Sequence, residues 1–225
     1  YRKKLRESGV TDQLVTKDKS VTGTSIILLT PDKERTMNTY LGANRLYSPE
    51  DVVEKSVEEA DLFYFTGYMW DTESQKNSVL KTLEICKKKG KKIAFDVADP
   101  FAVGRYRQTF QSLISEYCDI VFANSEEARY LMDNYDPYEC CRSLGKLCPI
   151  AVVKNGKKGS FLSDNRKISL IPMYGTSVPV DTTGAGDTYA AGFLYGYLTG
   201  RSNAAACNIA SYLPGRIITR IGAQF

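Results

Sequence analysis

The sequence predicts an α/β fold, in which a mostly parallel β-sheet is sandwiched by helices and a small β lid lies outside it. From Ser48 onward, short apolar segments alternate with segments of helical periodicity. Ahead of them, residues 21–43 contain two strand-like segments around Pro31-Asp32-Lys33-Glu34, which predicts a lid hairpin. A glycine-rich run at residues 181–187 lies between Val178–Val180 and an apolar helical segment, which predicts a strand–turn–helix unit.

Recognisable start and stop residues bound the individual elements. A short basic helix ends near Gly9, and Ser48-Pro49 begins another helix with an N-cap and a proline at the first helical position. The buried strands that follow are expected at 62–65, 92–97, 120–123 and 150–153, then a hairpin at 160–162 and 167–171, and the helices at 73–89, 106–116, 125–132 and 137–147. We see no repeat and no linker, so we expect one domain over residues 1–225.

Composition excludes several classes of function. The net charge of +4 comes from 30 basic and 26 acidic residues, and the one basic cluster, Lys87–Lys92, falls at a predicted helix end, where cations are favourable. We therefore expect no nucleic-acid partner. No apolar run approaches membrane-spanning length, and the six cysteines show no Cys-x-x-Cys spacing, so we expect a protein of the reducing cytoplasm without a membrane partner.

The chain contains no histidine. His-based triads, His metal ligands and His proton shuttles are therefore excluded within it. A general base must be a carboxylate or, less commonly, Lys, Tyr or Cys.

The run Asp181-Thr182-Thr183-Gly184-Ala185-Gly186-Asp187 is the strongest candidate site. Three successive small residues leave the first amides of the following helix uncovered, and such a helix start suits phosphate. Asp187 would repel a phosphate that simply rested there, but it can accept the proton of a hydroxyl that attacks the phosphoryl group. The alternative is a tight turn followed by an ordinary N-terminal helix carboxylate.

Polar residues follow several of the predicted strands. Because the carboxyl ends of parallel strands share one edge, where ligands collect, we expect these residues near the glycine-rich run. Each could instead be a turn or capping residue. On the lid, Arg35 can reach the charge that develops on a transferring phosphoryl group, or it is an exposed hairpin arginine. The edge residues are Asp96, Asp99, Asn124, Glu126, Glu127 and the run 154–159.

Residues 181–187 resemble the second signature of the ribokinase-like, or phosphofructokinase-B, family of sugar kinases. The resemblance implies a ribokinase-like fold. It also implies that Asp187 is the catalytic base and that Gly184, Ala185 and Gly186 supply the anion hole.

Further motifs of that family have counterparts here. Asn124-Ser125-Glu126-Glu127 resembles its Asn-x-x-Glu motif, which implies that Glu127 helps to hold, through water, the Mg²⁺ that accompanies ATP. Gly156 and Gly159 match a Gly-x-x-Gly turn along the nucleotide, and Asn208 falls where adenine is contacted. By the same resemblance, Asp181 and Thr183 would help to bind a monovalent cation such as K⁺.

Within the family, the chain is most similar to bacterial adenosine kinase-like proteins. The strings that carry this likeness are Glu34–Ala43, Gly67–Asp71, Asp99–Phe101 and Asp181–Tyr197. They imply an ATP-dependent kinase acting on a hydroxymethyl group of a nucleoside, with adenosine favoured, or of a sugar, as a monomer or homodimer. The alternative is a non-catalytic nucleotide-binding protein that keeps the fold, and a dinucleotide-binding oxidoreductase ranks far behind because no strand is followed by Gly-x-Gly-x-x-Gly.

Two departures from the family pattern give further expectations. The family's N-terminal core strand and acceptor-binding segment have no counterpart here, so we expect that this segment exists outside the sequence shown. Pro214 lies within the apolar stretch 204–221, and a proline removes an internal hydrogen bond, so we expect that helix to kink or split.

Overall fold

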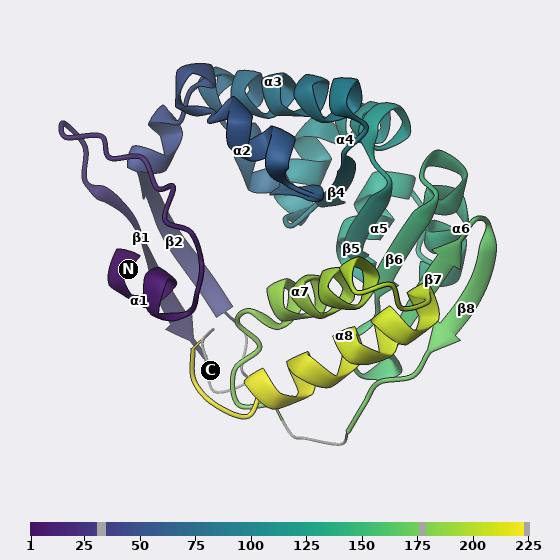
Figure 1. The fold of residues 1–225 in the computed structure, drawn as a ribbon. Helices are drawn as coiled ribbons and strands as arrows, with labels where there is room; N and C mark the ends of the chain where they lie inside the picture. Colours follow the sequence, from purple (N-terminus) through teal and green to yellow (C-terminus); the bar gives the residue numbers. More distant parts are fainter. Residues whose placement is uncertain (31–34, 176–178, 223–225) are drawn as a thin grey trace.

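Two β-sheets organise the chain (Figure 1). The computed structural model describes residues 1–30, 35–175 and 179–222. In that part of the chain, β1 (Thr22–Leu29) and β2 (Arg35–Gly42) form an antiparallel pair that stands apart from the larger sheet. The larger sheet has the order β3-β4-β5-β6-β7-β8, with strands Leu62–Thr66, Lys92–Asp96, Ile120–Asn124, Ile150–Lys154, Ser160–Asp164 and Lys167–Ile171.

Strands β3 to β6 run parallel, and β7 and β8 continue the sheet antiparallel. Their direction brings Asp96, Asn124 and Lys154, the last residues of β4, β5 and β6, to the same edge. The predicted mostly parallel sheet and the predicted hairpin are therefore confirmed. The turn at 31–34 lies outside the described residues.

Helices cover both faces of the larger sheet. On one face lie α3 to α6, and on the other lie α7 and α8 (Figure 1). Strand residues alternate between the two cores: Phe95 and Val121 face α3 to α6, whereas Ala94 and Phe122 face α7 and α8. The helices are α1 Arg2–Glu7, α2 Glu54–Glu59, α3 Glu73–Lys89, α4 Pro100–Tyr117, α5 Ser125–Met132, α6 Pro137–Leu147, α7 Ala185–Leu198 and α8 Asn203–Ile217.

Small residues bring α7 and α8 into close contact. A Cβ at Gly192 would lie 2.9 Å from the Cα of Ala210, and one at Gly196 would lie 2.8 Å from the Cα of Ala206. The two backbones therefore pack directly against each other. This contact fixes the direction of α7 and hence the position of its first turn.

Two predicted helix starts differ in part from the structure. The helix expected at 106–116 is the second part of α4, and it follows a kink at Tyr106, whose φ and ψ of −123° and 23° are not helical. The first part begins at Pro100, where the side chain of Asp99 caps the helix by accepting a hydrogen bond from the amide of Phe101. After Ser48 the chain forms a 3₁₀ turn, Pro49–Asp51, and α2 begins separately at Glu54.

Two other predictions are wrong. Val180 is not in a strand: its amide donates to the carbonyl of Ile218 at the end of α8 (2.7 Å), so its backbone bonds to a helix end instead of a neighbouring strand. Val178 lies outside the described residues. Pro214 does not split α8, which continues to Ile217 although the proline has no amide to donate to the carbonyl four residues earlier.

No described helix combines the length and the apolar character needed to cross a lipid bilayer.

Replacing Gly159 by alanine should destabilise the protein far more than replacing Gly156. Both glycines have positive φ, 89° and 54°, so each alanine carries backbone strain of about 1–2 kcal/mol. At Gly159 the added Cβ would also collide with the carbonyl oxygen of Ile171, whereas nothing lies within 4 Å at Gly156. We expect Gly159→Ala to lower the free energy of unfolding by about 3 kcal/mol in urea denaturation. Equal losses for the two variants would contradict this packing.

Candidate active site

Helix α7 begins at a glycine turn. Gly184, the N-cap, has φ 78°, a conformation in which other side chains are strained. Ala185, Gly186 and Asp187 form the first helical turn, where amides have no partner within the helix. The amide of Ala185 donates to the carbonyl of Thr182 (3.2 Å). Of the three predicted hole residues, Ala185 therefore already uses its amide within the turn.

Asp187 is exposed in the first turn of α7. Its carboxylate is therefore accessible to a small molecule, as the predicted base requires.

Asp181 organises the loop before α7. One of its carboxylate oxygens accepts hydrogen bonds from the amide and the hydroxyl of Thr183 (2.9 and 2.6 Å), and the other accepts from the amide of Gly222 (2.9 Å). Asp181 and Thr183 thus hold the turn together and fasten it to the chain that follows α8. Their predicted role in binding a monovalent cation remains a prediction.

Lys154, at the carboxyl edge of the sheet, lies beside the start of α7. The Lys154 ammonium lies 3.0 Å from Oδ2 of Asp96, and these side chains are only 16% and 6% exposed. A Cβ on Gly186 would lie 3.4 Å from the same ammonium. The space beside Gly186 is thus bounded by the start of α7 and by the half-buried ammonium of Lys154.

Asn124 and Glu127 cap helix α5 reciprocally. The Asn124 side chain accepts hydrogen bonds from the amides of Glu126 and Glu127 (2.9 and 2.8 Å). In return, the Glu127 carboxylate accepts from the amide and the side-chain NH₂ of Asn124 (2.7 and 2.5 Å). Asn124 is therefore a capping residue, the alternative that its type alone suggested, and it fixes the orientation of Glu127.

Burial raises the pKa of Glu127 to about 7. The negative charges of Asp96 and Asp99 contribute to the rise, and Lys154 opposes it. Glu127 as a whole is only 4% exposed. A buried carboxylate beside other acids favours a nearby cation.

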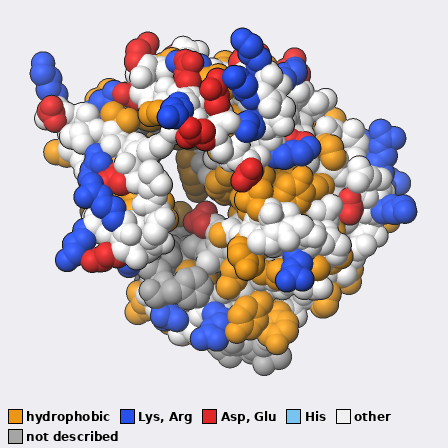
Figure 2. Space-filling model, viewed as in Figure 1, with side chains coloured by type: hydrophobic (Ala, Val, Ile, Leu, Met, Phe, Trp, Pro, Cys, Tyr) orange, Lys and Arg blue, Asp and Glu red, His pale blue; other side chains and the backbone are white. Residues whose placement is uncertain are grey.

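The same group of acids raises the pKa values of Tyr64 and Tyr68. Burial raises the pKa of Tyr64, and the charges of Asp96, Asp187 and Glu127 raise it further. Burial likewise raises the pKa of Tyr68 to about 12, with contributions from the same three acids and Asp99. Asp96 of β4, Glu127 of α5 and Asp187 of α7 therefore all lie close enough to these two tyrosines to raise their pKa values. In Figure 2, the molecule is hollowed between the side that carries β1 and β2 and the side that carries α7, and acidic atoms are visible inside.

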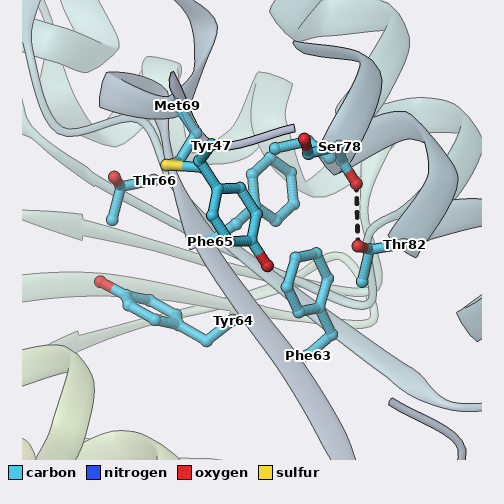
Figure 3. A pocket seen from close by; sticks show the side chains of 9 residues that line it. Tyr47, Phe63, Tyr64, Phe65, Thr66, Met69, Ser78 and Thr82 are labelled. Carbon is cyan, nitrogen blue, oxygen red and sulfur yellow. Dashed lines mark hydrogen bonds between the residues drawn. The ribbon is translucent and has the colours of Figure 1, made fainter. Parts of the chain in front are cut away.

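A cavity of about 310 Å³ lies along β3, the edge strand of the larger sheet. Tyr64 and Thr66 lie on one side of the strand, whereas Phe63 and Phe65 lie on the other with Tyr47 (Figure 3). Tyr64 thus faces the side of the sheet that bears α7, where Asp187 lies. The remaining lining residues are Met69, Ser78, Val79 and Thr82.

The other predicted residues are spread more widely. Gly159 is buried beneath β8, Gly156 is exposed in a 3₁₀ turn, and Asn208 is exposed on α8. Arg35 opens β2, and its side chain lies outside the description. The structure therefore brings together the strand ends and the start of α7, whereas the nucleotide roles of Gly156, Gly159 and Asn208 remain predictions.

The described residues contain no group of three or more Cys, Asp or Glu that could hold a metal ion by themselves. Mg²⁺, however, is commonly bound by one or two carboxylates together with phosphates and water. Glu127, at the edge where a phosphate would enter, fits such a shared site, whereas the Asp96 carboxylate is paired with Lys154.

Two residues near the start of α7 have no role that their sequence context predicts. Lys154 follows a predicted strand, and Tyr64 falls within one. For Lys154, the available signal was a lysine at the end of an apolar strand. The position of Tyr64 relative to α7 could not be predicted, because no local sequence pattern indicates where α7 packs.

A helix start beside a half-buried lysine and an exposed carboxylate, at the carboxyl edge of a parallel sheet, is a place where anionic ligands such as phosphate commonly bind. The chain belongs to the pfkB family: the model described as pfkB family carbohydrate kinase matches residues 1–225. The predicted family resemblance is thereby confirmed.

Two solved structures and a curated relative illustrate this membership. Adenosine kinase from Sinorhizobium meliloti shares 36% identity at a TM-score of 0.94, over 99% of this chain and 68% of that one. A probable sugar kinase from Rhizobium etli shares 37% identity at a TM-score of 0.93, over 98% and 67%. The 5-dehydro-2-deoxygluconokinase of Halalkalibacterium halodurans is 29% identical over 166 residues, which is 71% of this chain but half of that relative.

Asn124→Ala should lower the free energy of unfolding and raise the KM for Mg·ATP. The loss of the cap should lower the free energy of unfolding by about 1 kcal/mol, and the released Glu127 should raise the KM for Mg·ATP. Asp136→Ala is the matched control, because Asp136 caps the next helix, α6, by accepting from the amide of Tyr138 (2.9 Å). Urea denaturation and steady-state kinetics measure the two effects. A KM raised equally in both variants would contradict a specific role for the Asn124–Glu127 pair.

Proposed function

We propose that this chain forms the phosphoryl-transferring part of an ATP-dependent kinase. The enzyme moves the γ-phosphate of ATP to a hydroxymethyl group of a nucleoside, with adenosine favoured, or of a sugar. Asp187 accepts the proton of the attacking hydroxyl, while the amides at the start of α7 hold the phosphoryl oxygens. Arg35 adds positive charge from the lid.

One observation carries the proposal: the exposed carboxylate of Asp187 lies in the same helical turn as Gly186, and Gly186 lies beside the half-buried Lys154. An anion held at the helix start would lie next to a base that faces solvent. Phosphoryl transfer needs mainly positioning and charge stabilisation, so a chain without histidine is adequate.

The acceptor is the finer part of the proposal. The 36% identity to an adenosine kinase supports a nucleoside, whereas curated relatives at 26–29% identity are named for a sugar acid derivative. Release of ADP by the full-length protein, measured against adenosine, other nucleosides, ribose, fructose phosphates and 5-dehydro-2-deoxygluconate, distinguishes them. We expect the highest kcat/KM with adenosine.

The second candidate is a non-catalytic nucleotide-binding protein. The engaged amide of Ala185 favours it, because that amide cannot serve an anion without a change of the turn. The same assay decides: binding of ATP without acceptor-dependent ADP release would support this candidate and contradict the kinase.

Asp187→Asn should lower turnover by about 10²- to 10⁴-fold, the usual contribution of a positioned base, with little change in the affinity for ATP. Asp133→Asn is the matched control, since Asp133 is an exposed aspartate at the end of α5, on the opposite terminus of a different helix. Steady-state kinetics and calorimetry measure the two quantities. Near-normal turnover of Asp187→Asn would remove the proposed base.

Glu127→Gln should raise the Mg²⁺ concentration needed for half-maximal activity by about tenfold, because one negative charge is lost beside the phosphate site. When bound, magnesium supplies positive charge to the phosphate oxygens. The glutamine oxygen can still accept from the Asn124 backbone amide, but the glutamine NH₂ would face the Asn124 side-chain NH₂, so we expect a slightly lower Tm. An unchanged Mg²⁺ requirement would contradict the assignment of Glu127.

A further inference from the structure

Tyr189 carries a hydroxyl into the apolar core between α7, α8 and the larger sheet. The residue is only 7% exposed. Its hydroxyl forms a hydrogen bond of 2.7 Å with the hydroxyl of Ser160, which is fully buried. On the α8 side, Cys207 and Ser211 lie close enough to act on the pKa of the phenol, which burial raises. Tyr189 therefore links α7 to both of its neighbours through polar groups.

The hydrogen bond to Ser160 fastens α7 to the carboxyl edge of the parallel strands. Ser160 is the first residue of β7 and pairs with Lys154, the last residue of β6. Asp187 precedes Tyr189 by two residues, and a helix turns by about 100° per residue, so the two side chains point about 200° apart around the helix axis. Their burial agrees with this, since Asp187 is exposed and Tyr189 is buried. The inner residue can therefore fix the direction of the outer one.

Apolar packing alone does not account for the hydroxyl. Gly192 and Gly196 let α7 approach α8 closely, but apolar contacts are non-directional. A phenylalanine would fill the same space without the desolvation of a hydroxyl, which is costly unless the hydroxyl is hydrogen-bonded. A buried hydrogen bond is directional, and a satisfied polar network in a core favours one arrangement of the elements around it. The bond between Tyr189 and Ser160 thus restricts the rotation of α7 about its axis.

We propose that Tyr189 is a positioning residue for the transfer step: its hydrogen bond to Ser160 sets the rotation of α7 and thereby directs the Asp187 carboxylate towards the attacking hydroxyl. The proposal rests on the proposed function, in which Asp187 is the base. Tyr189 acts through the helix and not on the substrate, because it lies on the buried side of α7. The demand on its accuracy is high, since a displacement of about 1 Å from the reacting geometry can lower a rate by about 100-fold.

The test compares kcat of the full-length protein with and without the Asp187 carboxylate. Tyr189→Phe removes one oxygen and keeps the ring, so we expect kcat to fall by about tenfold and the KM for ATP to change by less than about twofold. In an Asp187→Asn background, the same change should lower kcat by less than about twofold, because the group that Tyr189 positions is already absent. Equal factors in the two backgrounds, or an unchanged kcat in the first, would overturn the proposal.

A tyrosine that serves stability alone gives a different result. Tyr189→Phe would then lower Tm and leave the kcat of the folded protein unchanged. Ser160→Ala is the second variant in case Tyr189→Phe does not fold. It removes the partner hydroxyl and keeps the tyrosine, and we expect it to lower kcat by about three- to tenfold, again only while Asp187 is present.

Tyr195→Phe is the matched control. Tyr195 lies on the same helix but is 65% exposed, so its hydroxyl points away from the core that holds α7 in place. We expect this variant to have the kcat, the KM and the Tm of the wild type. A tenfold loss of kcat in Tyr195→Phe as well would overturn the specific role of Tyr189.

Hydrogen exchange tests the anchoring of α7 without activity. In Tyr189→Phe, the amides of residues 188–190, which bond to the first turn of α7, should exchange at least about tenfold faster, whereas those of residues 195–198 should not change. Faster exchange together with a wild-type protein that never releases ADP would support the anchoring by Tyr189 and contradict the kinase. Transfer by the wild type with unchanged exchange and kcat in Tyr189→Phe would contradict Tyr189 alone. Unchanged exchange in a protein that never releases ADP would contradict both.

Discussion

The alignment of the strand ends with the start of α7 is the constraint on which the rest depends. Strands β4, β5 and β6 run parallel, so their last residues share an edge. The first turn of α7 lies at that edge because α7 packs backbone to backbone against α8 at Gly192 and Gly196. A larger side chain at either glycine would separate the helices and move the helix start away from Lys154.

This alignment gathers charges that would repel one another elsewhere. Burial raises the pKa of Glu127 to about 7, and the surrounding acids act in the same direction. Desolvated acids of this kind are costly unless a cation is near, and Lys154 supplies one from within the chain. Acidic groups therefore outnumber cations at this site, and a cation that arrives with a bound phosphate would reduce their repulsion. Such an imbalance is typical of functional sites.

Local patterns predicted most of the fold, and long-range contacts account for the errors. Helices at 73–89, 125–132 and 137–147 were predicted with their observed bounds because caps and periodicity are local signals. Val180 looked like a strand residue, but its hydrogen bond goes to Ile218, which is distant in sequence. The contacts of Lys154 could not be predicted either, since they depend on where Asp96 and Gly186 lie around it. The glycine-rich run was found from sequence because its spacing is itself the signal.

The most direct measurement is a crystal structure of the full-length protein with Mg²⁺ and a non-hydrolysable ATP analogue. We predict that oxygens of the terminal phosphates lie within hydrogen-bond distance of the Gly186 amide, with the Asp187 carboxylate facing the opposite side of the γ-phosphate from the nucleotide. Phosphates bound away from the start of α7, or an Asp187 carboxylate turned away from them, would contradict the central claim.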